Sequence, residues 1–305
     1  MTAGLAGGAE VLRRVVRGTA GVAELVEADQ VVRRPLPLSR RIAFVSVAGG
    51  SGTSATAAAV ANLWAARRTG MVLGVDAAGG PAALGWHAGR PLGDPSPDGP
   101  APDVAAARRR AALQSADARA GLGRADSGLH LLDLSTAEVP AAAVPRWRTD
   151  VSPIARFFDL VVTDWGVRRW EDDLAAVAQT GHVLALLARA DRHSATQAAA
   201  VLPRLLALEA APAVVLVLVD VRRTSDRVAA SLRRQLAVPV AIVSHEPATG
   251  AANLAGGRRL GPRTRREHIG LAAQLITAAS RPVAQTPNPV QPVRGRQRAR
   301  RVAAT

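Results

Sequence analysis

The stretch that most constrains the fold of this chain is residues 41–68, RIAFVSVAGGSGTSATAAAVANLWAARR. An apolar run typical of a β-strand, Ile42–Val47, enters a glycine-rich loop, and a helix-forming run, Ser54–Arg68, leaves it. Strand, glycine loop and helix in this order bind phosphate, because the loop N–H groups and the helix N-terminus face the anion together. Glycine supplies the positive φ angles and the close backbone approach that such a loop requires. The stretch therefore predicts a phosphate-binding loop.

The loop lacks the lysine of the usual P-loop pattern, G-x-x-x-x-G-K-[ST]. Its last three positions are Gly52, Thr53 and Ser54, and Val47 stands where the first glycine belongs. The chain contains no lysine, and all 39 basic residues are arginine, so no other segment can supply one. We therefore expect the frame of a phosphate loop without its principal cation.

Strand-like and helix-like segments alternate along the rest of the chain. Further strands are expected at Met71–Val75, Leu129–Leu134, Phe157–Asp164, His182–Leu187, Ala213–Val219 and Val238–Val243. Helices are expected at Val104–Ala120, Pro140–Ile154, Glu171–Gln179 and Ile269–Ala279. A further helix should run from Ser194 to Leu208 with a kink at Pro203, and another should begin after a cap at Thr224, Ser225 or Asp226. This alternation predicts an α/β fold, a three-layer, doubly wound, mostly parallel sheet. Ligands bind beyond the carboxyl ends of such strands, where Gly49–Ser54, Asp76 and Asp164 would gather.

Both ends of the chain differ from this core. Residues 1–38 combine a weakly periodic helical segment with a linker marked by Pro35 and Pro37, residues 39–280 form the domain, and residues 281–305 are a Pro- and Arg-rich tail that we expect to be disordered. The tail carries no acidic residue, and the whole chain has a net charge of +15. We expect the tail to bind DNA or acidic lipid nonspecifically, although a chain that simply favours arginine and alanine would carry the same charge without that role.

Composition narrows the possible classes of protein. The chain has no cysteine, which excludes disulfides and cysteine metal sites, and its six histidines share no metal-type spacing. Tyrosine is absent and aromatic residues make up 3%, which argues against a base-stacking surface for single strands. The longest apolar stretch, Ala210–Val219, is short of the ~20 residues of a membrane helix, and no signal peptide is visible. We expect a cytoplasmic protein, with peripheral attachment to the inner membrane face left open.

The order and spacing of these segments resemble the MinD/ParA family of P-loop ATPases, over nearly the whole domain from about Arg40 to Ala279. The loop of that family reads K-G-G-x-G-K-[ST], and residues 48–54 read AGGSGTS here. Its second strand ends in D-x-D, here DAA at residues 76–78, and its Walker B strand ends in an aspartate, here Asp164 after FFDLVVT. An asparagine near the adenine corresponds to Asp220, and residues 238–257 resemble the family's p-V-x-x-x-I-P-x-D segment.

The resemblance implies a nucleotide site that has lost charged residues. Ala48 stands where the family has the lysine that reaches the nucleotide of the dimer partner. Thr53 stands where it has the lysine that holds the β- and γ-phosphates, and Ala78 where it has the aspartate near the attacking water. Losing one charge-assisted contact costs ~1.5–3 kcal/mol, so we expect weak or absent binding of ATP or ADP and negligible hydrolysis. The retained positions imply that nucleotide would contact Gly49, Gly50, Ser51, Gly52, Thr53, Ser54 and Asp220, and that Mg²⁺ would contact Ser54, Asp76 and Asp164.

A degenerate member of this family would act as a positioning or regulatory subunit of a larger machine for secretion, pilus assembly or partitioning, and would have a protein partner. The short N-terminal helix and the basic pair Arg40 and Arg41 resemble actinobacterial secretion-associated members, including those of type VII systems. Any homodimer is expected to form without nucleotide, because Ala48 cannot make the contact across the interface.

Other interpretations of the same residues remain open. An active ATPase could use Arg192 or the pair Arg222 and Arg223 in place of the lysine. A dinucleotide-binding Rossmann protein would also fit, because Gly50-x-Gly52-x-x-Ala55 matches G-x-G-x-x-[GA] and Asp76 ends the next strand. A Tyr/Lys dehydrogenase mechanism is excluded, since both residue types are missing. The glycine loop could also be a tight turn, with the two aspartates capping the segments that follow.

Overall fold

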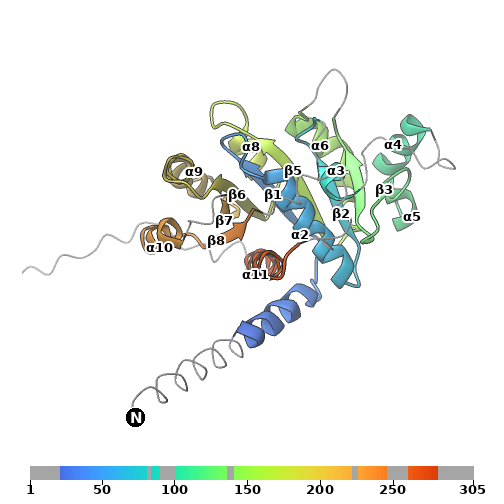
Figure 1. Ribbon diagram of the computed structural model, residues 1–305. Coiled ribbons are helices and arrows are strands. Elements are labelled where there is room, and N and C mark those ends of the chain that lie inside the picture. Colours follow the sequence, from blue (N-terminus) through green and yellow to red (C-terminus); the bar gives the residue numbers. More distant parts are fainter. Residues whose placement is uncertain are drawn as a thin grey trace, which may run out of the picture.

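The computed structural model describes residues 21–80, 84–89, 101–135, 141–221, 226–245 and 260–280. Within these residues, eight strands form one sheet in the order β3-β4-β2-β5-β1-β6-β7-β8 (Figure 1). All neighbouring strands run parallel except β3 and β4, which are antiparallel. The strands are β1 (Arg40–Ser46), β2 (Val72–Asp76), β3 (Gly123–Arg124), β4 (His130–Asp133), β5 (Leu160–Val167), β6 (Val183–Arg189), β7 (Ala213–Asp220) and β8 (Val240–Ser244).

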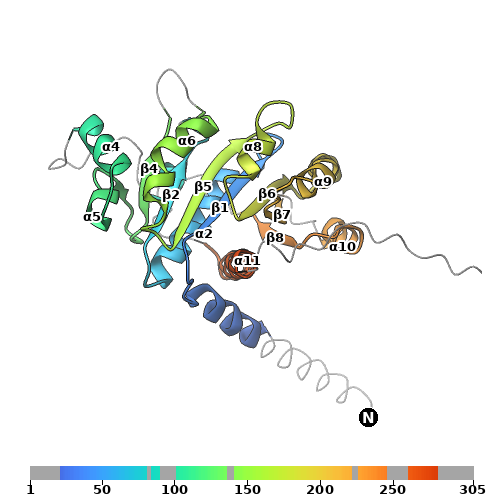
Figure 2. The same ribbon diagram turned by 180° about the vertical axis from the view of Figure 1, so that it is seen from behind.

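Helices cover both faces of the sheet, as the opposite views in Figures 1 and 2 show. One buried cluster joins the sheet to α2, α3, α11 and the helix over residues 21–33, and a second joins it to α6, α7, α8, α9 and α10. The labelled helices are α2 (Thr53–Arg67), α3 (Leu84–His87), α4 (Pro102–Arg110), α5 (Ser115–Ala118), α6 (Val144–Asp150), α7 (Ser152–Ala155), α8 (Leu174–Ala178), α9 (Arg192–Leu206), α10 (Asp226–Gln235) and α11 (Pro262–Ala279). The expected three-layer α/β fold is confirmed.

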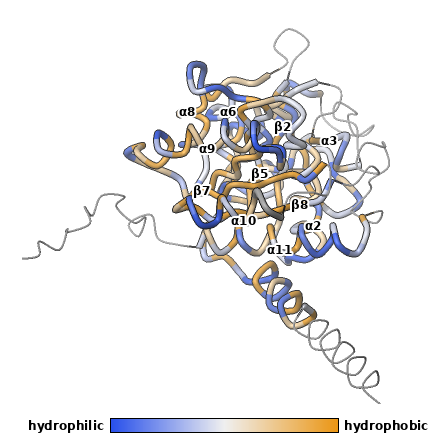
Figure 3. Tube along the Cα trace, turned by 60° about the vertical axis from the view of Figure 1, so that its left-hand side comes forward, coloured by the Kyte–Doolittle hydropathy of each residue, from blue (hydrophilic) through white to orange (hydrophobic). Residues whose placement is uncertain are grey.

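The strand sequences explain why the sheet is covered on both sides. Successive side chains of a strand point to opposite faces, and in β1 Ile42 and Phe44 join the cluster under α2, whereas Ala43 and Val45 join the other. Strands buried on both faces read as continuous apolar runs rather than alternating ones. In Figure 3 the central strands are mostly hydrophobic (orange), and many of the hydrophilic residues (blue) lie in the turns around them.

The helix over residues 21–33 projects from the body but is fastened at its C-terminal end (Figure 1). Val32 is fully buried, and the Arg68 guanidinium donates to the carbonyl oxygens of Val32 and Arg34 at 2.7 and 2.9 Å. Arg67 Nε lies 2.8 Å from an Asp29 carboxylate oxygen. The accessory helix expected before the first strand is therefore tied to the end of α2.

Three details differ from the sequence-based expectations. The antiparallel β3 was not expected, since two residues carry no periodicity. The helix expected over Val104–Ala120 is two helices, α4 and α5, separated at residues 111–114, and the helix expected over Pro140–Ile154 is also two, α6 and α7, which meet at Val151. Strand β5 does not end at Asp164 but continues to Val167, with a register irregularity against β1 between Phe44 and Ser46. The expected cap at residues 224–225 and the tail at residues 281–305 lie outside the described residues.

No helix in the described part of the chain is both long enough and apolar enough to span a membrane.

Candidate functional site

The glycine loop leaves the carboxyl end of β1 and enters α2, as expected. Gly50 and Gly52 have φ angles of 70° and 71°, so a side chain at either position would be strained. A Cβ atom at Gly49 or Gly50 would meet nothing within 4 Å, so open space lies beside the loop. The Ser51 hydroxyl donates to the Ala48 carbonyl at 2.8 Å and closes the turn. The backbone thus has the conformation and the open approach that an anion requires.

Strand order brings three aspartates to the same end of the sheet. Parallel β5 lies between β1 and β2, and Asp76 of β2 is in register with Asp164 of β5 on one side and Asp133 of β4 on the other. Across the loop, a Cβ at Gly52 would lie 3.5 Å from a Val219 methyl group, so the loop reaches the carboxyl end of β7, where Asp220 is buried. The structure therefore gathers the loop, Asp76, Asp164 and Asp220 at one end of the sheet.

Asp76 is fully buried and its carboxylate is already used by the backbone. Oδ1 accepts from the N–H groups of Ala78 and Gly79 at 3.1 and 2.9 Å, and Oδ2 accepts from that of Leu84 at 2.8 Å. Burial and the neighbouring Asp164 raise the pKa of Asp76 to about 7, against the lowering effect of the backbone N–H groups. In this conformation Asp76 holds the loop after β2 and offers little to a metal ion.

Asp164 is different because one of its oxygens has no partner. The side chain is fully buried, Oδ1 accepts from the Gly166 N–H at 3.0 Å, and Oδ2 has no hydrogen bond with the described residues. Burial raises the pKa of Asp164 to about 6, while the Ser54 side chain, the Gly166 N–H and Arg168 act to lower it. Ser54 thus influences this carboxyl but does not satisfy Oδ2 in hydrogen-bond geometry. A buried, unsatisfied carboxylate oxygen is unfavourable and favours a cation beside it.

These residues fit Mg²⁺ only in the presence of a phosphate ligand. The described residues contain no group of three or more His, Asp or Glu side chains that could hold a metal ion by themselves. Mg²⁺ is commonly bound by one or two protein groups together with waters and the phosphates of a nucleotide. Ser54 and Asp164 suit that arrangement, and Asp76 would have to release backbone N–H groups to join it.

Sequence reasoning missed Arg168, a buried arginine four residues after Asp164. Its guanidinium donates to the carbonyl oxygens of Trp165, Ala77 and Ala142 at 2.9, 3.0 and 2.9 Å, and it pairs with Asp173 at 2.8 Å. Because its donors are committed to these partners, Arg168 serves as a brace and does not replace the missing lysine. No motif marks such a residue, since its partners are backbone groups far apart in the sequence.

The arginines considered as substitutes for the lysine find little support. Arg192 is exposed in the first turn of α9, and Arg222 and Arg223 lie outside the described residues. Thr53 itself is buried at the start of α2. The dinucleotide-binding interpretation conflicts with the strand order, because β1 lies between β5 and β6 rather than beside β2 as in the usual Rossmann order.

Solved structures share this arrangement. The ParA family ATPase from Chlorobium tepidum TLS matches with a TM-score of 0.60 and 18% identity, over 77% of this chain and 99% of that one. The cell division ATPase MinD from Pyrococcus furiosus matches with 0.58 and 20%, over 79% and 100%. The septum site-determining protein MinD from Pyrococcus horikoshii OT3, in complex with Mg-ADP, matches with 0.55 and 18%, over 76% and 94%.

No family model and no curated protein sequence matches the chain. At identities of 20% or less the structural matches establish the fold alone. The chain has a MinD/ParA-like α/β fold.

Proposed function

We propose that this protein is a degenerate MinD/ParA-like ATPase that binds ATP or ADP with Mg²⁺ weakly, hydrolyses ATP negligibly and acts as a positioning or regulatory subunit. The observation that carries the proposal is the open glycine loop beside the buried, unpartnered Oδ2 of Asp164, without a lysine at either family position. The loop N–H groups remain to bind phosphate, and Asp164 with Ser54 remains for the metal. Asp220 at the end of β7 would lie toward the base.

The missing charges set the expected strength of binding and catalysis. Replacing the phosphate-binding lysine by Thr53 removes a contact of ~1.5–3 kcal/mol, which corresponds to roughly 10- to 150-fold in affinity. The same cation stabilises charge on the transferring phosphoryl group, so its loss also slows hydrolysis. Ala78, at the position of the family's second aspartate, has only a methyl group to offer an attacking water.

Calorimetry with ATP–Mg²⁺ and with ADP tests the proposal. We expect weak, saturable binding that is lost in Gly49→Asp, because a new carboxylate would face the phosphate from an open position without backbone strain. Gly49→Asn has the same shape without the charge and should retain most of the binding. Failure to bind at ligand concentrations up to about 10 mM would refute the nucleotide part. ATP turnover at the rate of an active ATPase, abolished by Asp164→Ala, would refute the proposed loss of catalysis.

We also propose that any homodimer of this chain forms without nucleotide. Ala48 has neither charge nor reach, so nucleotide adds little that differs between monomer and dimer, and a ligand shifts association only through such a difference. Sedimentation with and without ATP–Mg²⁺ should give the same association state. A monomer that becomes a dimer only with ATP, and that stays monomeric as Gly49→Asp, would contradict this and favour an active ATPase. As a positioning or regulatory subunit, the protein would be part of a larger machine for secretion, pilus assembly or partitioning.

A further inference from the structure

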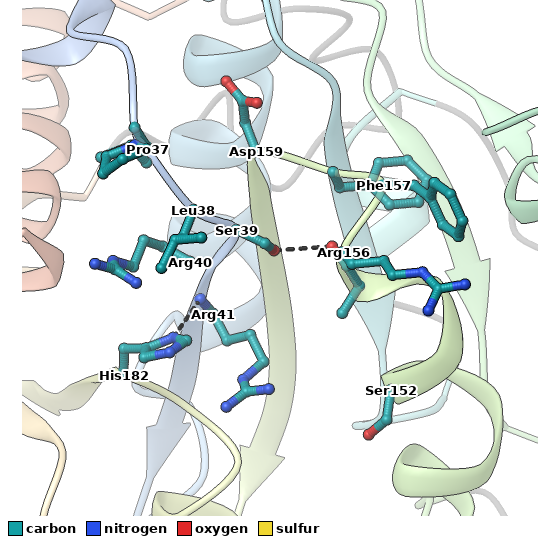
Figure 4. A pocket seen from close by; sticks show the side chains of 13 residues that line it. Pro37, Leu38, Ser39, Arg40, Arg41, Ser152, Arg156, Phe157, Asp159 and His182 are labelled. Atoms are coloured by element: carbon teal, nitrogen blue, oxygen red, sulfur yellow. Dashed lines mark hydrogen bonds between the residues drawn. The ribbon is translucent and has the colours of Figure 1, made fainter. Parts of the chain in front are cut away.

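A second hollow lies at the opposite end of the sheet from the glycine loop. A pocket of about 510 Å³ is formed by the linker before β1, the start of β1, the segment from α7 to β5 and the residue before β6 (Figure 4). Such a volume is in the range of small-molecule sites. The residues that matter for its chemistry are Leu38, Arg40, Arg41, Arg156, Phe157 and His182.

Two arginines of this pocket lack partners. The Nε atoms of Arg40 and Arg41 are buried and have no hydrogen-bond partner, and neither guanidinium has an ion pair or hydrogen bond with the described residues. Burial lowers the pKa of Arg41. Burying a charged group without a counter-charge is unfavourable. The half-buried guanidiniums of Arg40 and Arg41 are therefore groups that an anion would stabilise.

A third arginine is held beside them by contacts of its own. Arg156 donates through Nη2 to the Ala112 carbonyl at 2.9 Å, and its guanidinium lies 4.8 Å from the centre of the Phe157 ring. Arginine has five N–H donors, so this fixed group keeps others for a ligand. In Figure 4 Arg41 extends toward the part of the pocket where Ser152 lies, and Arg156 extends sideways from the facing segment, on the side of Phe157.

The acidic residue of the pocket lining does not neutralise these charges. Asp159 points to the other end of the pocket in Figure 4 and pairs with Arg68 at 3.3 Å. His182 adds a neutral donor. Its Nδ1 accepts the Arg41 backbone N–H at 2.9 Å, which leaves the ring proton on Nε2, and burial with Arg41 and Arg40 nearby lowers its pKa to about 4.

The lining also has an apolar side. Leu38 is 66% exposed at the linker, and the half-buried Phe157 lies under Arg156. Arginine forks match the planar pairs of oxygens on phosphate and carboxylate, and a phosphate dianion balances two cations where a carboxylate balances one. We propose that this pocket binds a small phosphate ester, with the phosphate between the facing segments that carry Arg41 and Arg156 and the organic group against Leu38 and Phe157.

Calorimetry with phenyl phosphate and with inorganic phosphate, on the full chain, tests the assignment. Phenyl phosphate should bind saturably and more tightly than inorganic phosphate. Arg41→Met, which keeps the stem and removes the charge, should weaken phenyl phosphate by roughly tenfold or more. The matched control is Arg234→Met, on the exposed face of α10, which should bind as the unmodified protein does. Gly49→Asp should also leave this binding intact, which separates the pocket from the glycine loop.

Three results would overturn the assignment. Absence of saturable binding of phenyl phosphate to the unmodified protein up to about 10 mM would remove the site. Equal loss in Arg41→Met and Arg234→Met would show a general attraction of anions to a basic protein. Inorganic phosphate binding as tightly as phenyl phosphate would leave no role for the apolar side and would refute an ester ligand.

Discussion

The two ends of the sheet carry buried ionisable groups of opposite kind, carboxyl groups at one end and guanidinium groups at the other. At the carboxyl end, Asp76 and Asp164 are buried side by side, and one carboxylate oxygen of Asp164 has no partner. At the amino end, Arg40 and Arg41 keep buried Nε atoms without partners. Strand β1 has seven residues and rises ~3.3 Å per residue, so the ends lie about 20 Å apart, too far for an ion pair between them. The two sets of charges therefore do not neutralise each other.

The difference between the ends lies in what each lacks. The carboxyl end has a glycine loop and buried carboxyl oxygens, and no lysine stands in that loop. At the amino end, the guanidinium groups of Arg40 and Arg41 have no ion pair with an acidic side chain among the described residues. On the two proposals above, each end would be stabilised by a ligand of opposite charge, Mg²⁺ with nucleotide at one and a phosphate ester at the other. Experiments on single variants can test these differences between the two ends.

The largest expected effect is on stability against pH at the carboxyl end. The folded protein keeps a proton on Asp76 up to about pH 7, whereas the unfolded chain releases it near 3.8, so the free energy of unfolding falls as pH rises through this interval. That difference in pKa corresponds to ~4 kcal/mol. Urea unfolding between pH 4 and 8 should show the decline, and Asp76→Asn should make it shallower, leaving the part that comes from Asp164, whose pKa is raised to about 6. The exposed control Asp172→Asn should leave the decline unchanged. A decline in Asp76→Asn as steep as in the unmodified protein would contradict the role given to Asp76.

The next effect compares a partnered and an unpartnered arginine at the amino end. Arg68→Met removes a guanidinium bound to two carbonyl oxygens and Asp159, so it should reduce the free energy of unfolding by ~3 kcal/mol. Arg41→Met removes a buried charge without a partner and should leave stability equal or higher. Thermal unfolding of both variants without ligand measures the contrast. Similar losses in both would mean that Arg41 has a stabilising partner.

A smaller effect concerns the missing lysine at the carboxyl end. Thr53→Lys should strengthen ATP–Mg²⁺ binding roughly 10- to 150-fold, ~1.5–3 kcal/mol, by restoring the charge-assisted phosphate contact. Thr53→Met supplies a long side chain without charge and is the matched control. Calorimetry on the two variants decides whether the lost cation limits affinity. No gain in Thr53→Lys, with the fold intact by circular dichroism, would show that the loop itself has ceased to bind phosphate.

The smallest expected effect on the folded domain is that of the tail. We propose that residues 281–305 bind DNA or acidic lipid nonspecifically, through Arg294, Arg296, Arg298, Arg300 and Arg301. Deleting residues 288–305 should leave the unfolding temperature unchanged and abolish binding to DNA or acidic vesicles, which should otherwise fall steeply with salt. Undiminished binding after the deletion would locate it elsewhere, and the pocket with Arg40 and Arg41 could then be tested.

Local patterns predicted the sheet and one end of it. Apolar runs with intervening helical segments predicted the three-layer fold, and the glycine spacing predicted the loop between β1 and α2. The motif residues Ser54 and Asp164 lie together, because β5 runs parallel beside β1 and the carboxyl ends of both strands meet at one edge. The order of the strands was not predicted.

Other features depend on tertiary contacts that no local pattern shows. The motif did not reveal that the backbone occupies the carboxylate of Asp76, since the N–H of Leu84 comes from eight residues later. The sequence predicted that the fourth strand ends at Asp164, but β5 continues for three more residues. The prediction stopped there because Asp164 and Gly166 interrupt the apolar run. The pocket at the amino end joins Arg41, Arg156 and His182, which are far apart in the sequence.

The brace formed by Arg168 also has a consequence for the order in which the protein opens. Besides the contacts of its guanidinium, the Ala77 N–H donates to the Asp164 carbonyl at 2.9 Å, and the Ala142 N–H donates to the Ala77 carbonyl at 3.0 Å. Three segments thus share one set of interlocking hydrogen bonds. In native-state hydrogen exchange the amides of Ala77 and Ala142 should therefore lose protection together, as one cooperative unit, and Arg168→Met should speed the exchange of both.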